Sequence, residues 1–328
     1  MPLLVSTPLQ IFLVEENLSQ VSILRSGDGY YFGITQKNDT VVISHSGGFL
    51  QYFRKNFQTA RTSRHLHQPH QIEWAEDKIL VTNTGRNCLS VYDENGGLER
   101  DVYLNEIRWD DKNLNRKGNH FNSVHKHGEK VFVVAHNYER PSEIWELNWP
   151  DLEVENIQVC DAGWAHNIWI SDHGKVICDS KNNRLYNASK NETFWQSIEA
   201  GTLTRGLAVS DKYIFVGYSS FSERHDRFWK TGGLWIIDRN TQKTIKQIPI
   251  PGSGDINEIR LLDEADEAHN GCILKSEYLE SIKSGSEIVN LAYNARKKYA
   301  FLQQNIFPIS PILRFVNLIP RWKYYFMN

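Results

Sequence analysis

The fold is decided by a succession of four short segments, His70-Gln-Ile-Glu-Trp74, Lys78-Ile-Leu-Val-Thr-Asn83, Cys88-Leu-Ser-Val-Tyr-Asp93 and Leu98-Glu-Arg-Asp-Val-Tyr103. Each segment is rich in β-branched and aromatic residues, and turn-forming Asp, Asn and Gly residues separate them, which is the pattern of β-strands. Together they make one unit: a short first strand, a strongly apolar second strand, a third strand that ends on a polar residue, and a weaker fourth. This order is typical of a β-propeller blade.

The unit repeats along the chain. Its first strands are expected to begin at His70, His120, His166, Arg205 and Asn257. The starts are about 40 to 50 residues apart, which is the period of blade-type repeats. Another blade is expected before His70, with strands at residues 21–24, 30–34 and 40–44. We therefore predict an all-β, six-bladed propeller, with five blades as the fallback.

The two ends of the chain have distinct roles in this scheme. The propeller is expected to span residues 1–275, with residues 9–14 as the strand that closes the last blade and residues 271–274 as a further candidate for that blade. Residues 276–328 form a second part, predicted to be a helix over 276–299 followed by an irregular aromatic tail. Residues 299–328 contain no Asp or Glu. This tail either packs on the outer wall of the propeller or docks to a membrane surface or a partner protein.

Composition excludes several classes of function. The net charge is −2, so no global basic field attracts nucleic acid. No glycine-rich phosphate loop occurs, and we expect no nucleotide cofactor. The N-terminus has no signal-peptide pattern and no apolar run is long enough to span a bilayer. The four cysteines lack metal-site spacing and are expected to be free thiols. These features predict a cytoplasmic protein, peripheral to a membrane if the tail docks there.

The first strands of the blades line the central channel, so equivalent positions of successive blades face one another. Three of these positions carry an imidazole, at His70, His120 and His166. Three neutral imidazoles with one open coordination position suit a divalent zinc, iron or copper ion. The alternative is that each histidine only bonds a neighbouring backbone carbonyl or lines a wet channel.

Other polar residues are expected around this ring. Arg205 would orient an anionic substrate or stabilise an oxyanion, and Glu258 or Tyr218 would move a proton. His136 ends a second strand and is expected near the same face. The remaining substrate-binding candidates are Asn122, Asn167, Glu73 and Asn257.

The blade pattern resembles NHL-type and SMP-30-like six-bladed propellers, and is closest to an uncharacterised bacterial family of conserved hypothetical proteins with a domain of unknown function. The resembling stretches are Val81-Thr-Asn-Thr-Gly-Arg-Asn-Cys-Leu-Ser90, Asn119-His-Phe-Asn-Ser-Val124, Thr204-Arg-Gly-Leu-Ala-Val209, Gly232-Gly-Leu-Trp-Ile-Ile-Asp238 and Ile256-Asn-Glu-Ile-Arg260. The resemblance covers about residues 65–262 and implies the fold. Among broader relatives, the histidine ring is more similar to lyases that hold a metal at the channel mouth than to calcium-dependent lactonases.

Two functions follow as hypotheses. The first is a metal-assisted lyase or hydrolase that acts on a small polar or anionic substrate at the channel mouth. The second is a non-catalytic propeller that binds a ligand or a protein, because a propeller is a scaffold for many functions.

Overall fold

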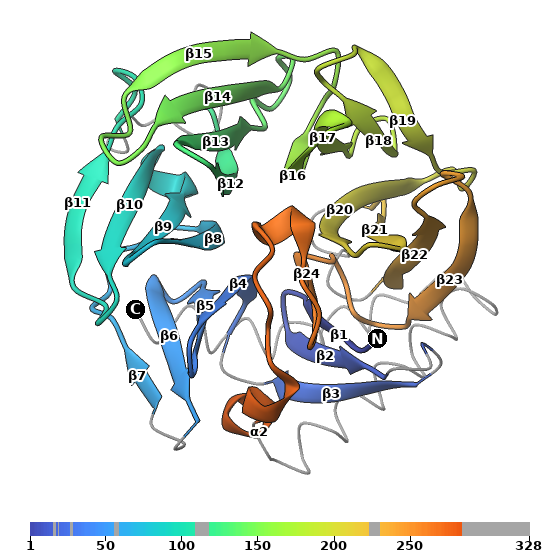
Figure 1. Ribbon diagram of the computed structural model, residues 1–328, viewed down its shortest axis with the longest axis horizontal. Coiled ribbons are helices and arrows are strands. Elements are labelled where there is room, and N and C mark those ends of the chain that lie inside the picture. The colour runs from blue at the N-terminus through green and yellow to red at the C-terminus, as the bar shows by residue number, and fades with distance from the viewer. Residues whose placement is uncertain are drawn as a thin grey trace, which may run out of the picture.

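The computed structural model describes residues 1–15, 18, 20–26, 29–55, 59–108, 118–222 and 230–283 of the chain. In these ranges the strands form six four-stranded antiparallel sheets, arranged as blades around a central channel (Figure 1). The predicted six-bladed propeller is confirmed, and the five-bladed fallback is wrong. Among the described residues, no helix combines the length and the hydropathy needed to cross a bilayer.

The first blade built from consecutive strands is made of β4 (Tyr31–Lys37), β5 (Thr40–His45), β6 (Phe49–Arg54) and β7 (Thr59–Arg61). The next comprises β8 (Pro69–Ala75), β9 (Lys78–Asn83), β10 (Cys88–Asp93) and β11 (Leu98–Val102), with the 3-10 helix η1 (Thr84–Arg86) between β9 and β10. Then come β12 (Phe121–His127), β13 (Lys130–Ala135), β14 (Glu143–Asn148) and β15 (Val154–Val159). The last two continuous blades are β16 (Ala165–Ser171), β17 (Gly174–Asp179), β18 (Arg184–Asn187) and β19 (Glu192–Gln196), and β20 (Thr202–Val209), β21 (Tyr213–Ser220), β22 (Gly232–Asp238) and β23 (Thr244–Ile250).

The sixth blade joins the two ends of the chain. Its order is β24 (Glu258–Leu261), β1 (Leu3–Ser6), β2 (Gln10–Val14) and β3 (Val21–Ser26). Residues 9–14 therefore do belong to the closing blade, but β1 and not β2 lies beside β24. The expected first strand of the blade before His70 was wrong, because residues 21–26 form the outer strand β3 of the closing blade. Residues 271–274 form no blade strand and make only isolated bridges.

The distance of a strand from the channel axis explains how apolar its sequence is. Each blade is covered on both faces by its neighbours, so its second strand needs apolar side chains on both sides. In β9, Ile79, Leu80 and Val81 are fully buried. The outermost strands face solvent along one edge, and β15 exposes most of its residues. The apolar second strand and the weak fourth strand of the repeat are thus consequences of distance from the channel axis.

Residues 262–283 leave β24 and cross to the outer wall. In Figure 1 the orange segment between β24 and α2 passes over the centre of the ring. It contains the 3-10 helices η3 (Glu267–His269) and η4 (Ser276–Tyr278) and ends in the short α2 (Leu279–Ile282). Tyr278, Leu279 and Ile282 pack into the core between the closing blade and the β4–β7 blade. Of the helix predicted for 276–299, the described residues hold η4 and α2, which ends at Ile282, and residues 284–328, including the tail 299–328, lie outside them.

Candidate functional site

A cavity of about 570 Å³ opens at the channel mouth. The structure brings the five predicted ring residues together on its wall: His70, His120, His166, Arg205 and Asn257. Phe32 of β4 supplies the corresponding position of the remaining blade, and it packs on His70 with 5.0 Å between ring centroids. This volume is in the range of small-molecule sites, about 300–1,000 Å³.

A shift of register in the inner strands brings the ring residues to the mouth. Five inner strands have one near their start, between Tyr31 and Ile34, Pro69 and Ile72, Phe121 and Ser123, His166 and Ile168, and Thr204 and Leu207. A β-bulge bends its strand and re-aims the side chain that it carries. His70 and Arg205 lie inside their bulges, and His166 borders one. The common shift therefore places Phe32, His70, His166 and Arg205 at one level. The predicted register of His120 is wrong: it precedes Phe121, which pairs with the end of its second strand as Ala165 does, so His120 corresponds to Trp164 and reaches the cavity from a different position.

Hydroxyl groups link each blade to the next at the same level. Ser44 donates to the His70 carbonyl oxygen at 2.6 Å, Thr84 donates to the Phe121 carbonyl, and Ser180 donates to the Thr204 carbonyl. Each of these hydroxyls lies at or just after the end of a second strand and reaches the inner strand of the neighbouring blade. Side-chain hydroxyls thus bind the backbone of the next blade near the ring, and one of them, Ser180, also lines the cavity.

Two of the histidines are held by the same local structure. In each case the residue two positions earlier has a left-handed backbone, Gln68 with φ 49° and Trp164 with φ 54°. The carbonyl oxygen of that residue then lies beside Nδ1 of the histidine, at 3.0 Å for His70 and 2.7 Å for His166. Bulky residues rarely adopt this conformation, so this turn is a specific device for orienting the imidazoles.

Both imidazoles are neutral at physiological pH. Burial is the main cause that lowers the pKa of His70, to about 3, and the positive charges of Arg205 and His136 lower it further. Burial and Arg205 likewise hold the pKa of His166 well below its ordinary value of 6.5. Loss of hydration disfavours the charged imidazolium, and a nearby cation repels it.

The hydrogen bonds then fix the tautomer. A carbonyl oxygen only accepts, so Nδ1 of His70 and of His166 must carry the proton of the neutral ring. Because Nδ1 carries the proton, the lone pair of each ring is on Nε2. A hydroxyl oxygen also lies near each Nδ1, Thr84 Oγ1 at 2.9 Å for His70 and Ser180 Oγ at 2.9 Å for His166. Two half-buried imidazoles in one cavity thus have a basic Nε2 and share the field of Arg205.

His120 and His136 extend the cluster of rings between these two. Ring centroids are 5.1 Å apart for His70 and His120, 4.9 Å for His120 and His136, and 5.5 Å for His136 and His166. Nδ1 of His120 lies 3.0 Å from the Tyr138 hydroxyl. Four imidazoles of three blades therefore form a continuous series along one side of the cavity.

The fit of a divalent metal to this cluster is partial. Nε2 lone pairs with Nδ1–H donated to a carbonyl are the usual state of metal-bound histidine. However, no group of three or more His, Cys, Asp or Glu side chains in the described ranges is arranged to hold a metal ion. The donors of His70, His120 and His166 are present without converging on one point, so we derive no chemical step through a metal.

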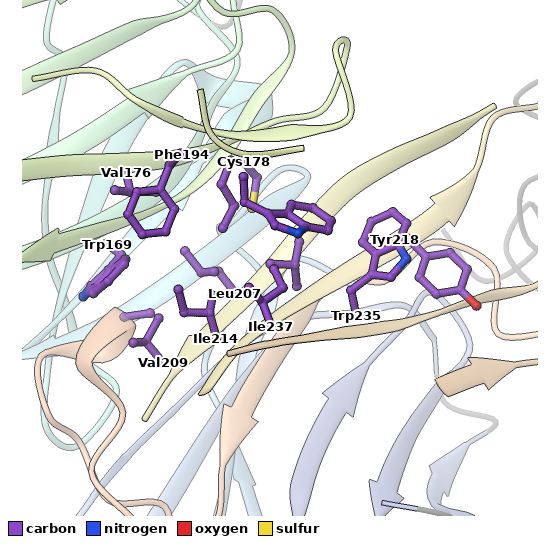
Figure 2. Close-up of a cluster of buried hydrophobic side chains, with 14 residues drawn as sticks. Trp169, Val176, Cys178, Phe194, Leu207, Val209, Ile214, Tyr218, Trp235 and Ile237 are labelled. Carbon is purple, nitrogen blue, oxygen red and sulfur yellow. The ribbon is translucent and has the colours of Figure 1, made fainter. Parts of the chain in front are cut away.

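The two proton-transfer candidates lie outside the mouth cavity. Tyr218 packs on Trp235 in the core between blades, with 4.7 Å between ring centroids, and burial raises the pKa of its hydroxyl to about 12 (Figure 2). Glu258 follows Asn257 but lies deeper in the channel, where Oε1 accepts from His269 Nε2 at 3.0 Å. Neither residue lines the mouth cavity itself. Glu258 lines a small adjoining void together with His70, His166 and Arg205, so its role in moving a proton stays a prediction, whereas Tyr218 lies in the core between blades.

Three of the four substrate-binding candidates make hydrogen bonds within the fold, and their role in substrate binding stays a prediction. Asn122 donates to the Ala165 carbonyl at 2.9 Å, and Asn167 accepts from the Gly206 amide at 2.8 Å. Glu73 accepts from the Lys126 amide and lines a second cavity, of about 530 Å³, at the other end of the channel. Only Asn257 lines the mouth, and its side-chain amide donates to the Tyr31 carbonyl. These side chains join blades, a role that the repeat pattern did not reveal.

Several residues of the mouth were not among the predicted site residues. They include Tyr30, Phe32, Tyr138, Glu139, Trp164 and Asp255. Tyr138, Glu139 and Trp164 lie in connections between strands. Tyr138 and Glu139 left only a weak signal in the sequence. Trp164 holds the same position before His166 as Gln68 holds before His70, but the residue type differs, so the sequence alone did not reveal it. His136 had a signal, its place at the end of a second strand.

No family model matches the chain, and no curated protein matches it. Solved structures do share its fold. A chain of the nidogen/laminin complex has a TM-score of 0.60 at 10% sequence identity, over 79% of this chain and 97% of that chain. A protein of unknown function from Bacteroides caccae has a TM-score of 0.55 at 11% identity, with the same coverage. A streptogramin B lyase has a TM-score of 0.50 at 12% identity, over 68% of this chain and 70% of that chain.

At these identities the likeness shows the fold alone. The chain is a six-bladed β-propeller closed by strands from both ends, and its channel mouth is lined by imidazole rings. Its relation to NHL-type or SMP-30-like propellers stays a prediction.

Proposed function

We propose that the protein binds a small anionic molecule at the channel mouth and converts it by acid–base chemistry, as a lyase or a hydrolase. The observation that supports this is the pair of neutral imidazoles, His70 and His166, with Nε2 lone pairs in the field of Arg205. Glu139 and Asp255 also line the cavity. The charge that acts most strongly on both imidazoles is nevertheless that of Arg205, so the deep part of the cavity favours an anion.

In this proposal Arg205 holds a carboxylate or phosphate group of the substrate, since a guanidinium offers several donors in a rigid plane. In a lyase reaction a neutral imidazole would take a proton from the carbon beside that group, and the electron pair of the C–H bond would form a double bond as the leaving group departs from the next carbon. A hydrolase reaction would use it to take a proton from the attacking water.

The low pKa of the free imidazoles also has a mechanistic consequence. A base with a pKa of about 3 is weak at neutral pH. A bound anion would offset the charge of Arg205 and would raise the pKa of His70 and His166 toward their ordinary values. Substrate binding would thus activate the base.

The four cysteines, all free thiols, support placing this reaction in the cytoplasm.

Binding of succinate and of inorganic phosphate, measured by calorimetry, tests the proposal. We expect Arg205→Gln to weaken the affinity about ten- to a hundred-fold, in proportion to the loss of a charged hydrogen bond. The control is Lys246→Gln, which removes an exposed charge on the outer strand β23. Failure of both anions to bind the wild type, or equal affinity in Arg205→Gln, would contradict the proposal.

A more specific version of this proposal adds a divalent metal ion bound by His70, His120 and His166. When bound, such an ion would polarise the substrate or activate water. Metal analysis of protein purified without an affinity tag tests it. Absence of zinc, iron and copper, with unchanged anion binding in the His70→Ala/His166→Ala double variant, would remove the metal from the proposal.

A non-catalytic ligand-binding propeller is the second candidate, and the weak basicity of His70 favours it. It shares the anion site and differs only in turnover. Anions that bind through Arg205 but are recovered unchanged, across a series of hydroxy acids and esters, would favour it. Docking of residues 299–328 to a membrane or protein stays a prediction outside the described residues.

A further inference from the structure

We infer that the ligand of the channel mouth carries a flat aromatic ring beside its anionic group. This inference rests on the proposed anion site and names the class of substrate that the site selects. The geometry that points to it is a series of nearly parallel rings, His136, Trp164 and Phe221, which runs from the imidazole cluster outward. We call this series the aromatic ladder.

The rings of the aromatic ladder are aligned to within a few degrees. His136 and Trp164 have an interplanar angle of 7° and centroids 6.3 Å apart. Trp164 and Phe221 have an angle of 5° and centroids 6.4 Å apart. Both distances lie in the range of aromatic pairs, about 4.5–7 Å. Lys181 Nζ also lies over the Trp164 ring, 5.9 Å from its centroid, so a ligand ring that stacks on that face of Trp164 has to displace this ammonium group. Trp164 is half-buried, and Phe221 is 57% exposed.

The position of Trp164 is coupled to the reactive centre. Its left-handed backbone presents its carbonyl to Nδ1 of His166. The residue that orients this imidazole therefore also presents an indole on the cavity wall. A ring stacked on Trp164 would lie next to His136, which is itself in edge-to-face contact with His166 at an interplanar angle of 84°. An aromatic ligand would stack on the ring faces of the aromatic ladder and would make edge-to-face contacts with the imidazole cluster.

The polar groups of the cavity favour an aromatic anion over a sugar acid. A sugar presents many hydroxyls, each of which needs a partner when buried. Three neutral side chains of the wall are already engaged: Ser46 accepts from the Tyr30 amide, Ser219 accepts from the Ile256 amide, and Asn257 donates to the Tyr31 carbonyl. A flat ring needs no such partners, and its single anionic group is served by Arg205.

Calorimetric titration with benzoate, cyclohexanecarboxylate and glucuronate tests the inference, because the first two share charge and similar size and differ in aromatic character. We expect benzoate to bind the wild type about three- to ten-fold more tightly than cyclohexanecarboxylate, the range of an aromatic pair. Trp164→Ala should abolish this preference while succinate still binds. Trp164→Phe should retain part of it and guards against a folding defect. Trp149→Ala, which lies outside the cavity, is the matched control.

Each outcome bears on a different claim. Equal affinity for benzoate and cyclohexanecarboxylate in the wild type, tighter binding of glucuronate, or an unchanged preference in Trp164→Ala would overturn the aromatic ligand and leave the anion site standing. Failure of all these carboxylates and of succinate to bind the wild type would instead remove the proposed function on which the inference rests.

Discussion

At the scale of the residue, a histidine acquires its chemistry from a few neighbouring atoms. His70 and His166 are ordinary in sequence, yet a carbonyl oxygen two residues earlier assigns the proton of each ring to Nδ1. Burial and Arg205 then keep both rings neutral. The same residue type deeper in the channel behaves in the opposite way. Burial and Arg260 lower the pKa of His269, but Asp266 and Glu258 outweigh them and raise it to about 9.

Removal of the guanidinium should change the titration of both channel imidazoles. In Arg205→Gln we expect the pKa of His70 and of His166 to rise, because a repelling positive charge is lost. Histidine ring signals followed by NMR between pH 3 and 8 would measure this, with Lys246→Gln as the control. Unchanged values in Arg205→Gln would show that burial alone lowers the pKa of these rings.

Anion binding should be accompanied by proton uptake. A bound sulfate, which stays fully ionised over the range tested, offsets Arg205 and raises the pKa of His70 above about 3. At a pH between the free and bound values the complex therefore holds more protons than the free protein, and affinity rises as pH falls. Calorimetry in two cationic buffers of different ionisation enthalpy, repeated at several pH values between 4 and 6, measures the protons taken up. A binding enthalpy that is the same in both buffers at every pH would contradict the predicted proton uptake.

At the scale of the element, the inner strands depend on close backbone approach at their bulges. Gly33 of β4 lies against β8, and a Cβ atom placed there would be 2.5 Å from the Ile72 amide nitrogen and 2.8 Å from Gln71 Cα. Backbone cannot move aside as a side-chain end can. The residue is glycine because two blades meet there at the level of the ring.

A side chain at this position should separate the two blades. We expect Gly33→Val to lower the free energy of unfolding by about 1–3 kcal/mol or more, the usual effect of overpacking. It should also weaken succinate binding, because His70 is carried by the displaced strand. Gly128→Asn is the control, since a Cβ atom there meets nothing within 4 Å and Asn tolerates its left-handed backbone. Urea denaturation of both variants measures the difference, and equal stability would refute the proposed contact.

At the scale of the whole molecule, the ring is closed by a strand of only four residues. β1 lies between β24 and β2, and its residues pair with both. Leu3, Leu4 and Val5 are fully buried there. Burial of such side chains contributes about 1.5–3 kcal/mol each, and three of them approach the total stability of an ordinary domain, about 5–15 kcal/mol. The propeller is thus expected to fold only when its two ends meet.

The closing strand should be among the most sensitive elements of the protein. We expect Leu4→Ala to lower the free energy of unfolding by about 2–5 kcal/mol, because it leaves a cavity in a fully buried site. Val154→Ala on the outer strand β15, where the side chain is 38% exposed, should change it by less than about 0.5 kcal/mol. Thermal and urea unfolding compare them. Similar losses in the two variants would mean that closure does not limit stability.

The histidines together predict a stability maximum near neutral pH. The folded pKa of His70 and His166 is below the unfolded value of 6.5, so the unfolded chain binds more protons and stability falls as pH drops from about 6.5 toward 3. The folded pKa of His269 is above that value, so its contribution is complete below pH 6.5 and is lost as pH rises through 9. Urea denaturation of the wild type and His269→Gln at pH 7 and 9.5 tests the alkaline limb. The variant should be less stable at pH 7 and should lose less on going to pH 9.5.

The sequence by itself determined the architecture and the members of the ring. Strand identity depends on local alternation and turn residues, and the spacing of His70, His120, His166 and Arg205 records one structural unit repeated. Because equivalent residues of a repeat occupy equivalent places, His70, His166 and Arg205 had to meet at one end of the channel. His120 lines the same cavity from a position two residues before the equivalent one. The closing blade was predicted only in part. Residues 9–14 were expected in it, but β1 and β3 also belong to it, because it is assembled from both ends of the chain.

Only the tertiary structure decided what those residues can do. Tyr218 and Glu258 were plausible from their places in the repeat, but one residue along a strand turns a side chain to the other face and another level of the channel. Trp164 and Tyr138 came from connections whose residue types follow no repeat. The neutral state of the imidazoles depends on burial and on Arg205, which lies one blade from His166 in the fold and far along the chain from His70. These are contacts through space, and a pattern along the chain does not encode them.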